Sequence, residues 1–110
     1  MRDIVILSAV RTAIGGFGGA LSGFAPHQLG ALVAREAILR ADLAPERIGT
    51  TVFGNVIATE PKDMYLSRLA AMGAGVSENA PAMNVNRLCG SGVQAVVSAA
   101  QALHLGDADF

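Results

Sequence analysis

The sequence lacks several residue types, and each shortage excludes a class of protein. Its 110 residues include a single cysteine, no tryptophan and only 5% aromatic side chains. One cysteine can form neither an internal disulfide nor a cysteine-rich zinc site, so a reducing, cytoplasmic setting without a bound metal is expected. So few aromatic rings leave little surface on which nucleic-acid bases could stack.

The sequence also lacks an excess of charge of either sign and any long apolar run. The formal net charge is −1 and the basic residues are scattered, so no basic surface for nucleic acid is expected. The run IVILSAV near the start is too short to cross a bilayer, and no signal-peptide cleavage site follows it. We therefore expect neither a nucleic acid nor a membrane as a partner. With 52% hydrophobic residues, the chain suits one globular domain or part of a larger one.

Apolar, β-branched segments alternate with segments in which apolar residues recur at helical spacing. Continuous apolar runs predict buried strands, while Pro26 fits the first turn of one helix and Gly106 the end of another. The order β-α-β-α-β-α predicts an α/β fold with a largely parallel or mixed sheet. Strands are expected at Ile4–Val10, Thr50–Ile57 and Pro81–Leu88, helices at 26–43, from about 63 to 75 and at 91–105, and the start of a fourth strand at 108–110.

The third expected helix is apolar nearly all round. Between Val93 and Leu103 its only polar residues, Gln94, Ser98 and Gln101, form one narrow stripe. Such a helix is expected to be buried between other layers, with its N-terminus at the carboxyl ends of the strands, where open α/β sheets bind ligands. Three apolar helices need more sheet than three strands provide. The chain is therefore expected to be the N-terminal part of a longer polypeptide.

Cys89 stands between the third expected strand and the third expected helix. Helix N-termini carry free N–H groups and about half a positive charge, which stabilise a thiolate and can hold an oxyanion. Gly90, Ser91 and Gly92 follow it, and their small side chains leave room for a substrate. Free cysteines are, however, among the most buried and inert residues. From the residues alone, a nucleophile and a core residue both stay open.

A thiolate nucleophile needs a base, and neither histidine of the chain is a convincing one. His104 follows Cys89 by fifteen residues, about 22 Å along a helix axis, so we expect it to interact with the helix C-terminus. His27 falls at the start of the first helix, where a capping or surface role is expected. Either Cys89 is not catalytic or its base lies beyond Phe110.

The glycine-rich stretch GGFGGALSG follows the first expected strand and invites comparison with a dinucleotide-binding loop. Its spacing does not fit, because Leu21 stands where the third glycine of that motif is required. A flexible connection or a subunit contact is expected instead.

Three separated blocks of the sequence share their order and character with a known enzyme family. The block VNRLCGSGVQAVVSAAQAL has an asparagine, two residues, a cysteine, small residues and then an apolar helix. SAVRTAIGGFGGAL precedes it as an opening strand and loop, and FGNVIATEPKDMYLSRLAAMGAG as a second strand and helix. Over Ile4 to Phe110 the sequence resembles the thiolases, and looks closest to bacterial β-ketothiolases of the acetyl-CoA acetyltransferase type.

The resemblance implies a layered thiolase-like fold with a buried central helix after the nucleophile. Thiolases, transferases of fatty-acid metabolism, interconvert two acyl-CoA molecules with a 3-ketoacyl-CoA and free CoA, and need no further cofactor. By this resemblance Cys89 is the catalytic residue that carries the acyl group, for example from acetyl-CoA, and its backbone N–H contributes to an oxyanion site. A second cysteine and two histidines complete the family's site. Thiolases are commonly homodimers or homotetramers.

Only Cys89 can be carried over from the family's site, and no CoA-binding residue can be assigned. Residues 1–110 are expected to be the N-terminal part of a thiolase N-terminal domain and to be inactive alone. Two alternatives stay open: a ketoacyl synthase-like condensing enzyme with the same nucleophile, and a non-catalytic interaction module.

Four polar residues have two interpretations each. Asp63 is expected to cap the second helix or to interact with its dipole. Arg11 and Arg87 could meet a CoA phosphate, but contacts with solvent or with an acidic partner are the simpler expectation. Asn86, just before the cysteine, would either brace the backbone of the turn or make a simple hydrogen bond at the strand end.

Overall fold

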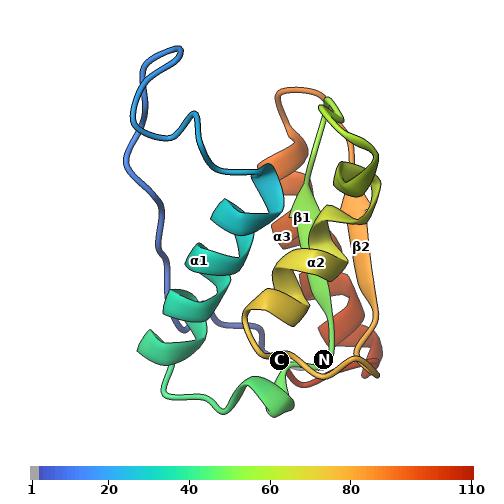
Figure 1. Cartoon of the computed structure of the whole chain (residues 1–110). Coiled ribbons are helices and arrows are strands. Elements are labelled where there is room, and N and C mark those ends of the chain that lie inside the picture. The colour runs from blue at the N-terminus through green and yellow to red at the C-terminus, as the bar shows by residue number, and fades with distance from the viewer. Residues whose placement is uncertain (1–2) are drawn as a thin grey trace.

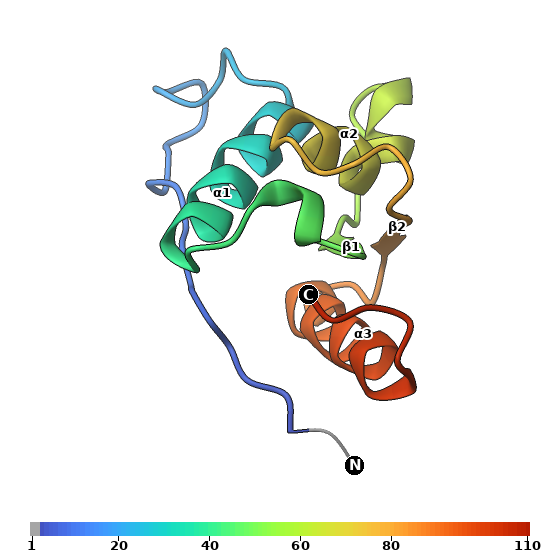
Figure 2. The ribbon, with the colours of Figure 1, turned by 90° about the horizontal axis from the view of Figure 1, so that it is seen from below.

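The computed structural model describes residues 3–110 as a small three-layer arrangement (Figure 1). Helices α1 and α2 cover one face of a two-stranded sheet and α3 covers the other, as seen along the layers in Figure 2. This arrangement confirms the predicted α/β fold class. The elements in chain order are α1 (Pro26–Arg40), the 3₁₀ turn η1 (Pro45–Arg47), β1 (Thr51–Gly54), the 3₁₀ turn η2 (Pro61–Tyr65), α2 (Leu66–Gly73), β2 (Ala82–Val85) and α3 (Ser91–Leu105).

The sheet consists of β1 and β2, which pair in parallel with Thr51 opposite Ala82 and Gly54 opposite Val85. Both predicted strands are therefore confirmed, although each is shorter than the apolar run that predicts it. Because the strands are parallel, their carboxyl ends lie at the same edge, and the turn that carries Cys89 begins there.

Helix α1 begins where the sequence predicts, with Pro26 in its first turn. The side-chain oxygen of Gln28 accepts a hydrogen bond of 2.8 Å from the Ala25 N–H, which satisfies one free donor at the helix start. The helix ends at Arg40, three residues before the predicted end, because Asp42 adopts a left-handed conformation with φ of 54°. The second predicted helix is divided: η2 covers its first turn and α2 starts at Leu66.

The core lies between α1 and α2, where small residues let the two helices approach closely. A Cβ atom at Gly30 of α1 would lie 2.9 Å from the Ala70 Cβ, and one at Gly73 of α2 would lie 2.8 Å from the Ala31 Cβ. Close approach excludes water from the apolar residues below. The buried cluster consists of Ile38, Ala71, Ala74 and Val76, with Ala34, Leu43, Ile48 and Ala80 packed against it.

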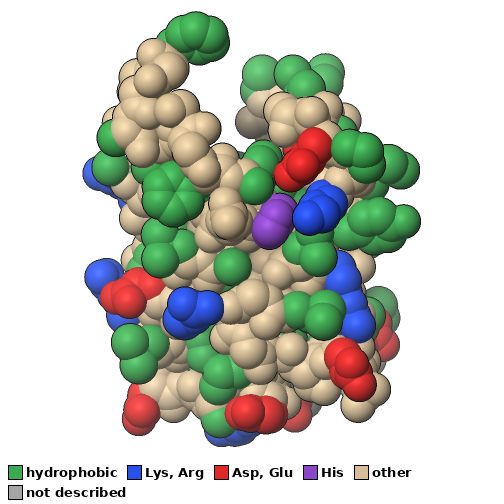
Figure 3. All heavy atoms as spheres, in the orientation of Figure 1, with side chains coloured by type: hydrophobic (Ala, Val, Ile, Leu, Met, Phe, Trp, Pro, Cys, Tyr) green, Lys and Arg blue, Asp and Glu red, His purple; other side chains and the backbone are tan. Residues whose placement is uncertain are grey.

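Large apolar side chains are exposed, and Figure 3 shows several of them on the face over η2 and α2. On these two elements, Met64 is 71% and Tyr65 is 63% exposed. No helix of residues 3–110 combines the length and the hydrophobicity that a membrane span requires.

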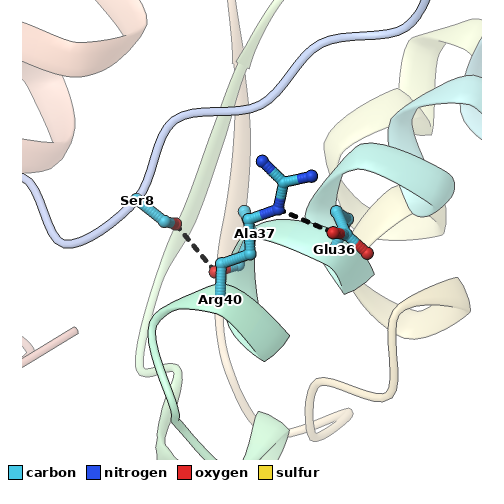
Figure 4. Close-up of polar contacts among 4 residues, drawn as sticks. All are labelled: Ser8, Glu36, Ala37 and Arg40. Atoms are coloured by element: carbon cyan, nitrogen blue, oxygen red, sulfur yellow. Dashed lines mark hydrogen bonds and ion pairs between the residues drawn. The ribbon is translucent and has the colours of Figure 1, made fainter.

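The predicted first strand, Ile4–Val10, is not a strand in this structure. The segment is extended and runs beside α1, where the Ser8 hydroxyl donates a 2.7 Å hydrogen bond to the Ala37 carbonyl (Figure 4). A strand exists only as a member of a hydrogen-bonded ladder, and among the described residues β1 pairs with β2 alone. The apolar side chains in the middle of the segment are consequently exposed, with Val5 at 69%, Ile6 at 78% and Leu7 at 52%.

The predicted start of a fourth strand at 108–110 is also absent from this structure. The end of the chain returns instead to the loop before β1, where the Gly49 N–H donates a 2.8 Å hydrogen bond to the Phe110 carbonyl. The Arg47 guanidinium lies 4.5 Å from the centre of the Phe110 ring, a cation–π contact that stabilises this return.

Helix α3 has the predicted limits, and Gly106 ends it in the left-handed conformation with φ of 82°. The expectation that it is buried on all sides is wrong for this chain. Ser91 and Ala95 are buried, but Val93 is 73% and Val96 is 58% exposed. The reason is that, within residues 3–110, only the sheet side of the helix has a neighbouring layer (Figure 2).

Candidate active site

Cys89 lies in the turn between β2 and α3, two residues before the first residue of the helix. Its side chain is exposed, so the interpretation as a buried core residue is wrong. The predicted placement at a helix N-terminus is confirmed. A nucleophile that must reach a substrate carbonyl needs this accessibility.

The backbone of the turn is held in an unusual conformation directly before the cysteine. Leu88 has φ of 49°, in the left-handed region that residues with a Cβ rarely adopt. Such a conformation costs on the order of 1–3 kcal/mol and persists only where neighbouring groups enforce it. Asn86 and Ser91 are those neighbours. The Asn86 Oδ1 accepts from the Leu88 N–H at 3.0 Å, and the Ser91 hydroxyl donates to the Leu88 carbonyl at 2.6 Å.

Asn86 therefore braces the turn, and because it also makes a hydrogen bond at a strand end, both of its predicted roles are present. Its amide group also reaches the strand end of β1, where Nδ2 donates to the Val56 carbonyl at 3.4 Å. The loop after β1 and the cysteine turn are thus connected through one side chain.

Open space lies on one side of the first turn of α3. A Cβ atom at Gly92 would meet nothing within 4 Å, so a ligand can approach the helix start from that side. The N–H groups of Gly92 and Val93 have no hydrogen-bond partner among the described residues, as is usual in a first helical turn. These donors and the positive end of the helix dipole favour an anion beside Cys89.

Arg87 lies in the turn before α3 and extends the polar stripe of that helix, and it forms no ion pair within residues 3–110. Its Nη1 donates to the Gln94 side-chain oxygen at 2.7 Å, and the Gln94 Nε2 donates to the Ser98 hydroxyl at 3.1 Å. Two residues of the predicted stripe, Gln94 and Ser98, are thus joined by a hydrogen bond and connected through Arg87 to the turn that carries Cys89. Among the described residues, Arg11 bonds to the adjacent Thr12 carbonyl alone, at 2.9 Å.

Neither histidine is placed to activate Cys89. His104 lies in the last turn of α3, at the opposite end of the helix from Cys89. His27 lies in the first turn of α1, which packs on the other face of the sheet from α3 (Figure 2). Two cavities of about 1050 and 330 Å³ run along the N-terminal segment, and Cys89 lines neither. Among the described residues, neither a histidine nor either of these cavities lies beside Cys89.

A buried carboxylate organises the loop that follows β1. Asp63 is fully buried in η2, and its Oδ2 accepts hydrogen bonds from the Thr59 hydroxyl at 2.6 Å, the Thr59 N–H at 2.7 Å and the Glu60 N–H at 3.3 Å. These bonds hold the pKa of Asp63 below its usual value, with a smaller contribution from His27, although burial acts in the opposite direction. Of its two predicted roles, that of N-cap is wrong, because Glu60 is the N-cap of η2. Asp63 lies in the first turn of η2, where its carboxylate accepts from the Glu60 N–H. The other carboxylate oxygen, Oδ1, is buried and unpaired among the described residues.

Ser67 and Asn84 form a polar pair that the sequence did not predict. The Asn84 Oδ1 accepts from the Ser67 N–H at 2.9 Å, while its Nδ2 donates to the carbonyls of Asp63 and Met64 at 3.1 Å. The Ser67 hydroxyl accepts from the Phe53 N–H at 3.1 Å. The only signal for this pair was a polar residue inside each of two apolar segments. The pair fixes η2 and α2 to both strands.

Comparison with known proteins places this geometry in a family. The profile of the family described as "Thiolase, N-terminal domain" matches residues 4–110. The β-ketothiolase BktB of Cupriavidus necator is 62% identical over 108 residues, which are 98% of this chain and 27% of that protein. The acetyl-CoA acetyltransferase of Clostridioides difficile is 43% identical over 94 residues, covering 86% of this chain and 87% of that one.

Solved structures agree with the sequence relatives. The crystal structure of the Acat5 thiolase from Ascaris suum in complex with coenzyme A matches 97% of this chain and 28% of its own, with a TM-score of 0.92 and 31% identity. The chain spans about a quarter of the length of BktB and of this thiolase. Because the profile, the relatives and the solved structures agree over nearly every residue, the chain belongs to the thiolase family.

Proposed function

We propose that this chain supplies the acyl-carrying nucleophile of an acyl-CoA acyltransferase of the β-ketothiolase type. The observation that carries the proposal is the exposed Cys89 at the N-terminus of α3, in a turn held by Asn86 and Ser91. Membership of the thiolase family supports the reaction class. The reaction is the condensation of two acyl-CoA molecules, such as acetyl-CoA, to a 3-ketoacyl-CoA and CoA, and its thiolytic reverse.

In the first step the Cys89 thiolate attacks the thioester carbonyl of an acyl-CoA. A bond forms between Sγ and the carbonyl carbon, and the carbonyl oxygen becomes an oxyanion. N–H groups at the start of α3 stabilise this charge. The oxyanion then collapses, the carbon–sulfur bond to CoA breaks, and the CoA thiolate leaves with the electron pair. The product is acyl-Cys89, a covalent intermediate that divides the reaction into two easier steps.

In the second step the α-carbanion of another acyl-CoA attacks the acyl-Cys89 carbonyl and releases the cysteine. The base that forms the carbanion is a second cysteine in this proposal, and a histidine activates Cys89. Residues 1–110 contain only one cysteine, so the second cysteine is not among them, and His27 and His104 both lie away from Cys89. No metal or cofactor takes part in either step, since thioesters are already activated for attack.

The proposal extends to the cellular location and the oligomeric state of the protein. We place the protein in the cytoplasm because its sequence has one cysteine and because the relatives include bacterial and cytosolic enzymes. A homodimer or homotetramer would cover the apolar side chains exposed on η2, α2 and α3.

Intact-mass spectrometry tests the proposed function. The chain is incubated with acetyl-CoA, and an acetyl adduct is expected that Cys89→Ala abolishes. Hydroxylamine, which cleaves thioesters, should remove the adduct. Alkylation by iodoacetamide in a parallel sample shows that the thiol is accessible. Alkylation without any acetylation would contradict the proposal and favour a non-catalytic interaction module.

A further inference from the structure

The inference concerns Ser91, whose side chain is buried under the cysteine turn. Ser91 is 5% exposed and is the first residue of α3. Its hydroxyl makes two hydrogen bonds to the backbone on either side of Leu88. It accepts from the Arg87 N–H at 2.8 Å and donates to the Leu88 carbonyl at 2.6 Å.

The Leu88 carbonyl is held from two sides by the same residue. Besides the hydroxyl, the Ser91 N–H donates to this oxygen at 3.0 Å. With the bond from the Leu88 N–H to the Asn86 Oδ1 at 3.0 Å, both polar backbone groups of Leu88 are fixed. The left-handed conformation of Leu88 is therefore imposed by three hydrogen bonds to its backbone, two of which Ser91 provides, one through its hydroxyl and one through its N–H.

This arrangement determines the direction of the next N–H group. The Leu88 carbonyl and the Cys89 N–H belong to one planar peptide, and in the trans form they point in opposite directions. Since Ser91 holds the carbonyl oxygen toward the start of α3, the Cys89 N–H must point to the other side of the peptide. Rotating that peptide would turn the N–H and would also move the Cys89 side chain.

We propose that Ser91 is a positioning residue for catalysis, which fixes the Leu88–Cys89 peptide so that the Cys89 N–H can stabilise the oxyanion formed at Cys89. The role rests on the proposed acyl transfer to Cys89. Ser91 does not touch the substrate in this proposal and acts only through the peptide. The orientation is built into the chain before any ligand binds, which is how oxyanion sites are effective.

The test compares two reactions of the same thiol. Alkylation by iodoacetamide requires an accessible thiolate and forms no oxyanion, whereas acetylation by acetyl-CoA passes through one. For Ser91→Ala we expect acetylation to slow about tenfold or more, with alkylation changed less than about threefold. Ser98→Ala, which removes a hydroxyl from the same helix two turns later, is the matched control and should leave both rates unchanged. Equal acetylation rates in Ser91→Ala and Ser98→Ala would overturn the proposal, as would parallel losses in both reactions of Ser91→Ala.

Amide exchange measured by NMR separates this inference from the proposed function. In the unmodified chain the Arg87 N–H should be protected, because it donates to Ser91, and Ser91→Ala should abolish that protection. If the unmodified chain is not acetylated at all, the proposed function fails, and exchange at Arg87 still decides whether Ser91 holds the turn. An unprotected Arg87 N–H in the unmodified chain would overturn the inference even if the alanine variant did not fold.

Discussion

The Ser67 hydroxyl oxygen lies 2.6 Å from the Asn84 Oδ1, and this contact joins α2 to β2 across seventeen residues of sequence. Asn84 also donates to the carbonyls of Asp63 and Met64 at the end of η2. One amide group thus connects three elements on the α2 side of the sheet.

Replacing Asn84 with alanine is expected to lower the free energy of unfolding by about 1–3 kcal/mol, because the Ser67 N–H and the carbonyl oxygens of η2 lose their partner. Urea denaturation followed by circular dichroism measures the change. Asn79→Ala is the matched control, since Asn79 is exposed in the loop before β2 and should lose less than about 0.5 kcal/mol. Equal losses in the two variants would show that the connection contributes nothing.

The Ser67–Asn84 pair also shows which kind of contact the sequence does not predict. Pro26, Gly106 and the position of Cys89 before a helix were predicted correctly, because each depends on residues close in the chain. Ser67 and Asn84 are far apart in sequence, and neither is unusual alone. Their contact follows only from the packing of α2 on the strands.

Two of the wrong predictions of structure have a related cause. Ile4–Val10 has the composition of a buried strand and α3 that of a buried helix, and both preferences come from the residues themselves. Whether a strand pairs or a helix is covered depends on its neighbours. Within residues 3–110, the segment Ile4–Val10 lies beside α1 without a strand to pair with, and α3 has one covered face.

Asp63 is expected to make stability depend on pH in acid. Its hydrogen bonds to Thr59 and Glu60 lower its pKa in the folded chain below the ordinary value of 3.8. The folded state therefore binds the proton less readily than the unfolded state. The resulting stabilisation is fully present above pH values of about 4 and is lost as the pH falls through the lowered pKa.

The measurement is the urea midpoint between pH 7 and pH 2.5 for the unmodified chain and for Asp63→Asn. The variant should be less stable at neutral pH and should lose less stability on acidification, since an amide does not titrate. Asp107→Asn, at an exposed position after α3, should keep the pH dependence of the unmodified chain. An unchanged acid response in Asp63→Asn would contradict the assignment.

The left-handed conformation of Leu88 gives a prediction about backbone strain. Leu88 is 68% exposed, so its side chain adds little to packing, and the effect of a substitution reports mainly on φ of 49°. Leu88→Val should lower the free energy of unfolding by roughly 1–2 kcal/mol, because β-branched residues tolerate this region least.

Leu88→Gly should be more stable than Leu88→Val, since glycine adopts positive φ without a steric cost. Leu105→Val, at a 79% exposed position in α3, supplies the control for the same change in side chain and should cost less than about 0.5 kcal/mol. If valine were equally harmless at both positions, the turn would not hold Leu88 in this conformation in solution.

The last prediction separates the two halves of the proposed reaction. Residues 1–110 provide Cys89 but no second cysteine, and the described histidines lie at the far end of α3 and on the opposite face of the sheet. We expect the chain alone to accept an acetyl group from acetyl-CoA without forming acetoacetyl-CoA, because no base is placed to remove an α-proton. Chromatography of the CoA esters should therefore show free CoA in an amount equal to acetyl-Cys89 and no condensation product. Acetoacetyl-CoA formed by the chain, and abolished by Cys89→Ala, would mean that a base within residues 1–110 completes the site.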